Sequence, residues 1–202
     1  MEADAAELRV LGCLIEKQRT TPDQYPLSLN SLRLACNQAT NRDPVVDYDE
    51  PTIRAALEKL SRKEWVRLAS GPGSRTAKYR HLFDSALGLA APEIALLAVL
   101  MLRGPQTLAE LRARTERLHS FESTEEVEAA LTGLAGRELV ERLSRRPGER
   151  EERWRQLVGG GEPDAAAPAP AAAPETDRLT EIEERMRRIE EAVAALQDAL
   201  ER

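Results

Sequence analysis

The sequence contains few of the residues from which catalytic and metal sites are commonly built. Cysteine and histidine occur only at Cys13, Cys36, His81 and His119. These residues form no CxxC pair and no Cys/His set with zinc-ligand spacing, so the sequence predicts no metal, no cofactor and no disulfide framework. No Ser, Cys or carboxylate lies at a spacing that would make either histidine part of a catalytic pair. The sequence therefore predicts no catalytic residues, and we expect a protein that is not an enzyme.

Aromatic residues and long apolar runs are also scarce. Aromatic side chains make up 3% of the chain, so the core must consist mainly of Leu, Ala, Val and Ile, a composition that favours helices. The longest apolar run, Ile94–Leu102, is shorter than the ~18 residues expected of a membrane-spanning helix. The acidic start of the chain does not resemble a secretory signal. We therefore expect a cytoplasmic protein without membrane contact.

The net charge is unevenly distributed along the chain. Residues 1–158 contain equal numbers of basic and acidic residues, and residues 159–202 carry the whole net charge of −6. A nucleic-acid-binding surface would therefore be a local basic patch.

An internal repeat divides the first 158 residues into two similar parts. Segment 53–66 recurs as 127–140, and Tyr79-Arg80-His81-Leu82 recurs as Trp154-Arg155-Gln156-Leu157. In each part, three helical patterns precede two short strand patterns around a turn. This order is typical of a winged helix-turn-helix. The predicted fold class is mainly α with small β-hairpin wings, in two tandem winged helix-turn-helix domains at residues 1–88 and 89–158.

Local signals predict where these elements begin and end. Ser28, Asp49 with Pro51, and the capping box Thr107 to Glu110 are expected to start helices. A first helix is predicted at 5–17, a helix at 92–102, and a helix beginning at Thr124. Strands are predicted at 65–69, 78–82, 139–143 and 152–158.

The C-terminal part of the chain has a different composition. Residues 159–176 form a Gly/Ala/Pro linker, in which repeated prolines prevent a helix. Residues 177–202 are predicted to form a coiled-coil helix that self-associates, because apolar residues recur at a/d heptad spacing. The alternative is that this helix folds back on its own domains. The residues of the apolar seam are Leu179, Ile182, Met186, Ile189, Val193, Leu196 and Leu200.

Several motifs in residues 1–158 resemble the YceH-like family of uncharacterised bacterial proteins. The resemblance implies tandem winged helices and implies no particular biochemical role. Its motifs are Leu11–Lys17, Thr20–Asn30, Ala35–Gln38, Asn41–Val45, Lys78–His81, Leu102–Thr107 and Arg145–Gly148.

The third helix and wing of the first domain are the candidate DNA-binding surface. The helix carries basic residues on its outward face, although Glu50 and Glu58 oppose phosphate binding there. The wing carries three basic residues with no carboxylate between them, which suits phosphate or minor-groove contact. The alternative is ordinary surface charge on a soluble hairpin. The candidate DNA-binding residues are Thr52, Arg54, Lys59, Arg62, Arg75, Lys78 and Arg80.

Two further surfaces have sequence features that suggest a role. The polar loop Asn37, Gln38, Asn41 and Arg42 either caps helices and stabilises the loop or binds a phosphate or a partner backbone. The third helix of the second domain has almost no outward positive charge.

That helix instead presents Ala129, Gly133 and Gly136 beside the acidic Glu125, a face suited to packing against protein.

The expected function is a dimeric DNA-binding protein, of the transcription-regulator type. The competing hypothesis is a non-enzymatic scaffold whose winged helices pack against protein partners.

Overall fold

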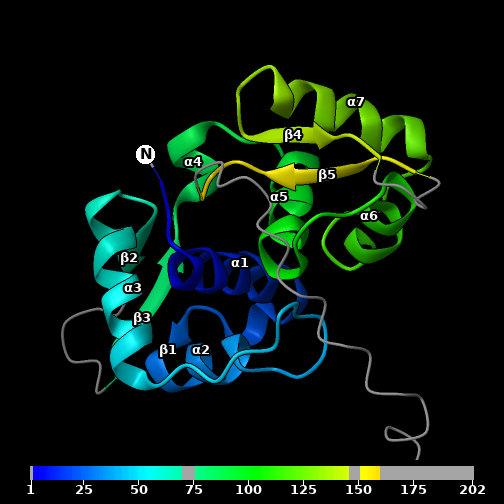
Figure 1. The fold of residues 1–202 in the computed structure, drawn as a ribbon. Coiled ribbons are helices and arrows are strands. Elements are labelled where there is room, and N and C mark those ends of the chain that lie inside the picture. Colours follow the sequence, from blue (N-terminus) through cyan, green and yellow to red (C-terminus); the bar gives the residue numbers. More distant parts are fainter. Residues whose placement is uncertain (1, 70–75, 146–150, 160–202) are drawn as a thin grey trace, which may run out of the picture. The chain divides into compact units, whose positions relative to one another are not determined.

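Figure 1 shows the fold in a computed structural model, which describes residues 2–69, 76–145 and 151–159. Across these ranges the protein is mainly helical, with seven α-helices, a short 3-10 helix and two small antiparallel sheets. The predicted mainly α class with small β-hairpins is therefore confirmed. Apart from Gly159, the predicted linker and the C-terminal helix lie outside the described residues. None of the helices in these ranges is long and apolar enough to cross a membrane.

The three longer helices of the N-terminal half, residues 2–88, begin at capping residues. Asp4 and Glu7 form a reciprocal capping box, with both hydrogen bonds at 2.9 Å. Ser28 and Asp49 cap the next two helices, as predicted. The elements of this half are α1 (Ala5–Thr20), η1 (Pro22–Gln24), β1 (Leu27–Ser28), α2 (Leu29–Cys36), α3 (Glu50–Arg62), β2 (Val66–Leu68), β3 (Lys78–His81) and α4 (Phe83–Leu87).

The C-terminal half, residues 89–159, repeats the order of three helices and a hairpin, and a single bridge between Gln106 and Trp154 takes the place of the β1–β3 pairing. The capping box of Thr107 and Glu110 is present as predicted, and the third helix of this half begins at Thr124 with Ser123 as its cap. The elements of this half are α5 (Ala91–Arg103), α6 (Leu108–Thr115), α7 (Thr124–Ala135), β4 (Val140–Leu143) and β5 (Arg153–Gln156).

Several boundaries differ from the sequence-based prediction. The first helix continues to Thr20 instead of ending at Lys17, and each of the four predicted strands is shorter than expected. Three elements were not predicted: the 3-10 helix η1, the two-residue strand β1 and the helix α4. β1 pairs antiparallel with β3, so the N-terminal hairpin becomes a three-stranded sheet in the order β1-β3-β2.

The two halves share a detailed backbone pattern. Val66 pairs with His81 in the first hairpin, and the equivalent Val140 pairs with Gln156 in the second. After α3 and α7, the chain turns through a residue with positive φ, which is 60° at Glu64 and 56° at Glu138. The sequence repeat thus corresponds to the same helix ending and the same strand register in both halves.

The halves pack together through α1 and α5, which lie side by side in Figure 1. Gly12 permits their close approach, because a Cβ atom there would lie 2.9 Å from Cγ of Leu102. Two backbone hydrogen bonds also join the halves: Ala3 N–H donates to the carbonyl of Val158, and Asp43 N–H donates to that of Leu102. One hydrophobic core therefore runs through both halves.

Candidate nucleic-acid interface

The outward face of α3 carries the predicted basic residues. Ile53, Ala56, Leu57 and Leu60 form the buried stripe, as the helical period predicts. On the opposite face Arg54 and Arg62 are exposed, Thr52 is half-buried, and the carboxylates of Glu50 and Glu58 are exposed beside them.

Lys59 differs from the other basic residues of α3 because its charge has a partner. Its Nζ lies 2.6 Å from Oδ2 of Asp4 at the start of α1, and this hydrogen bond raises the pKa of Lys59. Both side chains are nearly half exposed, at 47% and 45%. Lys59 therefore contributes less free positive charge to this face than Arg54 and Arg62.

The hairpin β2–β3 adds basic residues that face away from the core. Along β3, Lys78 is exposed, Tyr79 and Arg80 are half-buried and His81 is buried, and the strand alternation places Lys78 and Arg80 on the face opposite to that of His81. Arg80 lies directly opposite Arg67 of β2. The remaining predicted wing residue, Arg75, lies outside the described residues.

The pair Arg67–Arg80 brings two like charges together. Cross-strand neighbours of the same charge are destabilising, because their side chains share one face of the hairpin. No carboxylate in the described part of the chain pairs with either guanidinium, and the buried Nε of Arg80 makes no hydrogen bond there. Arg67 was not among the predicted site residues; its basic side chain within the predicted strand 65–69 was a weak signal in the sequence, and its place opposite Arg80 follows from the strand register.

The equivalent pair in the C-terminal half is an ion pair. Glu141 of β4 lies opposite Arg155 of β5, and the Arg155 guanidinium donates to the Glu141 carboxylate. Since the register of the two hairpins is the same, the two pairs differ only in that one contains Arg67 where the other contains Glu141. At this cross-strand position, therefore, only the N-terminal hairpin has two basic residues without a carboxylate partner among the described residues.

A buried polar network fixes the position of this hairpin against α1. The His81 ring lies 2.6 Å from Oε1 of Gln18 through Nε2, and the His81 backbone N–H donates to the hydroxyl of Tyr25 at 2.8 Å. Burial lowers the pKa of His81 to about 4 and raises the pKa of Tyr25 to about 12. Both side chains are therefore neutral at pH 7 and have a structural role.

The predicted polar loop is held by internal hydrogen bonds. Asn37 makes two bonds with the backbone of Tyr48, and Arg42 donates to Ala35, Asn41, Gln38 and Glu16. The Arg42 side chain is fully buried, and its Nη2 lies 2.6 Å from Oε2 of Glu16. Burial is the largest single effect on Arg42 and opposes its charge, but the hydrogen bond to Glu16, the charge of Glu16 and the nearby thiols together outweigh it, so the pKa of Arg42 is raised.

The outward face of α7 has the composition that the sequence predicts and lies open to solvent. Ala129, Gly133 and Gly136 are exposed, as is Glu125 at the start of the helix. The N-terminal half therefore does not cover this face within the described part of the chain.

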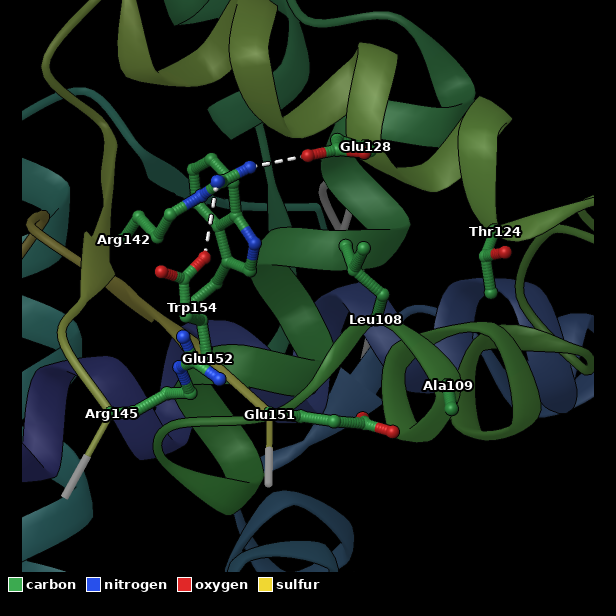
Figure 2. Close-up of a pocket in the computed structure, with 9 residues that line it drawn as sticks. All are labelled: Leu108, Ala109, Thr124, Glu128, Arg142, Arg145, Glu151, Glu152 and Trp154. Carbon is green, nitrogen blue, oxygen red and sulfur yellow. Dashed lines mark hydrogen bonds and ion pairs between the residues drawn. The ribbon is translucent and has the colours of Figure 1, made fainter. Parts of the chain in front are cut away.

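A pocket of about 440 Å³ lies beside this helix, between α6, α7 and the second hairpin (Figure 2). Arg142 lies over the Trp154 ring at 5.0 Å and pairs with both Glu128 and Glu152. These ion pairs balance the charge of Arg142, so this pocket has no strong attraction for a phosphate group.

The two cysteines are buried in the core of the N-terminal half. The neighbouring Cys13 thiol and burial together raise the pKa of the Cys36 thiol, which keeps it protonated. No group of three or more His, Cys, Asp or Glu residues among the described positions could hold a metal ion.

Comparison with known proteins identifies the family to which this chain belongs. A family model described as "Protein of unknown function, DUF480" matches residues 3–149. A UPF0502 protein of Serratia proteamaculans is 47% identical over 207 residues, which cover 99% of this chain and 94% of the relative. A UPF0502 protein of Pelobacter propionicus is 48% identical over 200 residues, covering 94% of this chain and 91% of the relative. A UPF0502 protein of Shewanella sp. strain ANA-3 is 44% identical over 212 residues, covering 100% and 97%.

These matches confirm that the chain belongs to an uncharacterised bacterial family, as expected. The names given to this family in the comparisons are DUF480 and UPF0502, and not YceH-like. The alignments cover more than nine tenths of the chain, so they extend beyond Val158 into the C-terminal region. The chain belongs to the DUF480 family, and the three bacterial relatives described above are each named UPF0502 protein.

Proposed function

We propose that the protein binds double-stranded DNA through the first of two tandem winged-helix domains, and that it acts as a dimeric transcriptional regulator. In this proposal α3 enters the major groove with Arg54 and Arg62 on its outward face, and the β2–β3 wing lies along the adjacent phosphate backbone. The second domain, α5 to β5, orients the first and offers its own surface to protein.

The observation that carries the proposal is the like-charge pair Arg67–Arg80. Two arginines on one face of a small hairpin repel each other, which costs stability unless an external anion is bound. A phosphate backbone supplies such anions at regular spacing. The equivalent pair Glu141–Arg155 supports this interpretation, because the same backbone register accommodates an ion pair where no anion is needed.

The charge reversal Arg67→Glu is expected to lower DNA affinity without lowering the free energy of unfolding. It recreates in the first hairpin the acidic–basic pair of the second, so we expect the free energy of unfolding to stay the same or to rise by ~0.2–1 kcal/mol. We expect DNA affinity to fall about tenfold or more, because a charge-assisted contact contributes ~1.5–3 kcal/mol. Urea unfolding measures the first quantity, and a fluorescence anisotropy titration with random duplex DNA measures the second.

Salt dependence provides a second readout of the same surface. Replacing Arg75, Lys78 and Arg80 by Ala should reduce the slope of log affinity against log salt by up to ~0.9 for each lost phosphate contact. Arg155→Ala is the matched control, because it removes the basic residue at the equivalent position of the second hairpin. DNA affinity and salt slope should be unchanged in that control.

The proposal fails if Arg67→Glu and the triple variant bind duplex DNA as tightly as the unmodified protein. An equal loss in Arg155→Ala would also contradict it, because the effect would then follow total charge and not the hairpin. Either result would favour the scaffold hypothesis.

The exposed face of α7 supports a protein contact in the second domain. Ala129 and Gly133 allow a partner helix to approach closely, and Glu125 disfavours a phosphate backbone. Hydrogen exchange on the full chain should show this face protected by protein and unaffected by duplex DNA. Protection by DNA alone would contradict a protein contact.

Dimer formation is proposed to depend on the coiled-coil helix at residues 177–202. Three heptads are short, so we expect modest self-association at tens of micromolar. Sedimentation of the full chain should give a larger species than residues 1–161, which retain the compact unit described above. Monomers in both samples would show that this helix does not join two chains.

A further inference from the structure

A second pocket lies between the two halves of the described unit, away from the hairpin. It measures about 380 Å³, within the ~300–1,000 Å³ typical of small-molecule sites. The end of α1 and the polar loop after α2 contribute one side, and α5 and α6 contribute the other. Both halves must therefore be packed together for this pocket to exist.

The lining of this pocket is strongly basic. Lys17, Arg103, Arg114 and Arg117 line it, against one carboxylate, Glu16. Both oxygens of Glu16 accept hydrogen bonds from the buried Arg42, at 3.1 and 2.6 Å. The one carboxylate of the lining is thus already neutralised.

Arg103 shows that positive charge accumulates in this pocket. Burial lowers the pKa of Arg103, and the nearby guanidinium groups of Arg114 and Arg42 lower it further. Its Nη2 donates to Oδ1 of Asn41, a neutral acceptor. Arg114 lies 3.4 Å from Glu110 in the same helix, whereas no carboxylate among the described residues pairs with Arg117.

Helix ends offset only part of this charge. α1, α5 and α6 end at the pocket, and each helix C-terminus carries the equivalent of about half a negative charge. Lys17 also lies 3.7 Å from Glu16, so Arg42, Glu16 and Glu110 must be counted with the four basic residues of the lining, which gives five positive and two negative charges. Three helix ends offset about one and a half of the three net positive charges. A net positive charge remains for a ligand to neutralise.

We propose that this pocket binds a small organic molecule that carries a phosphate group. Arginines from the C-terminal half and Lys17 from α1 approach the phosphate from different sides, and the side chains of Gln38 and Thr40 add neutral hydrogen-bonding groups. Val99, Leu102 and Leu118 provide an apolar wall for the organic part of the ligand. Because the ligand contacts both halves, its binding stabilises their packed arrangement.

Calorimetric titration of the full chain with sodium pyrophosphate tests the proposal, with ionic strength kept constant by sodium chloride. We expect saturable binding, and about tenfold or greater loss of affinity in Arg103→Gln and in Arg117→Gln. Arg19→Gln is the matched control, because Arg19 is an exposed arginine of α1 that does not line the pocket. Its affinity should be unchanged. Sodium citrate should bind more weakly than pyrophosphate.

Arg117 is exposed, so its replacement is expected to leave the folded structure intact, as thermal unfolding without ligand would verify. The proposal is overturned if pyrophosphate does not bind, or if all three variants bind it equally. Tighter binding of citrate would overturn the assignment of a phosphate ligand. If Arg117→Gln instead weakens duplex DNA binding as much as Arg67→Glu does, the pocket belongs to a DNA surface and the small-molecule proposal is wrong.

Discussion

The contact between α1 and α5 makes a prediction of opposite sign for two glycines. Gly12 and Gly133 both lie within helices, and neither has a positive φ. Replacing an interior helical glycine by alanine stabilises a helix by ~1 kcal/mol in the absence of other effects. The two positions differ in the space available for the added methyl group.

At Gly12 the new Cβ atom would lie 2.9 Å from Cγ and 3.0 Å from Cδ2 of Leu102, and 3.3 Å from Cβ of Met101. These atoms are held by the core, so α1 and α5 must move apart, and such overpacking costs ~1–3 kcal/mol. At Gly133 the nearest atom is 4.0 Å away, at Oε1 of Glu93. Gly133→Ala should therefore gain up to ~1 kcal/mol, whereas Gly12→Ala should range from no change to a loss of ~2 kcal/mol.

Urea unfolding of the full chain at pH 7.5 measures both free energies. Their difference cancels the helix-propensity contribution and leaves the packing cost at Gly12, expected to be ~1–3 kcal/mol. If both variants were stabilised by the same amount, the close contact of α1 with Leu102 would be refuted. The packing of the two halves would then need a different explanation.

Two further predictions concern buried polar groups, at His81 and at the pair Arg42–Glu16. The folded pKa of His81, about 4, lies below the reference value of 6.5. Between these pH values the unfolded state binds more protons than the folded state. The neutral, buried His81 therefore contributes its full stabilisation above pH 6.5, and this stabilisation is lost as the pH falls towards 4. The loss is about 3 kcal/mol in the free energy of unfolding. His81→Gln, which introduces the residue found at the equivalent Gln156, should flatten this part of the pH profile in urea unfolding; an unchanged profile would contradict the assignment. Arg42→Met leaves the largely buried Glu16 with the longer, 3.7 Å contact to Lys17 and should cost up to ~3–5 kcal/mol, whereas Arg42→Met/Glu16→Gln should recover part of that loss. If the single and double variants had the same free energy of unfolding, Arg42 and Glu16 would not be energetically coupled.

Many of the local features could be predicted from the sequence, because their causes lie within a few residues. The Asp49 cap and the Thr107–Glu110 capping box act within one helical turn, so neighbouring residues suffice to place these helix starts. The buried stripe of α3 follows from the helical period alone. The repeat also predicted that both halves contain two short strands around a turn, since similar segments prefer similar local conformations.

The candidate sites depended much more on contacts between distant residues. The pairing of Arg67 with Arg80 depends on strand register, and the two-residue strand β1 is too short to show an alternating pattern. Arg103 and Arg117 reach one pocket with Lys17 only because α5 packs along α1.

The sequence by itself therefore determined helix starts, apolar faces and the repeated order of elements, since each depends on short-range geometry. Tertiary structure alone decided which charges are compensated. The Asp4–Lys59 and Glu16–Arg42 pairs each join residues far apart in the chain, whereas Arg67 and Arg80 meet without a carboxylate among the described residues. Charge compensation depends on distances across the folded core, and no periodicity in the sequence encodes those distances.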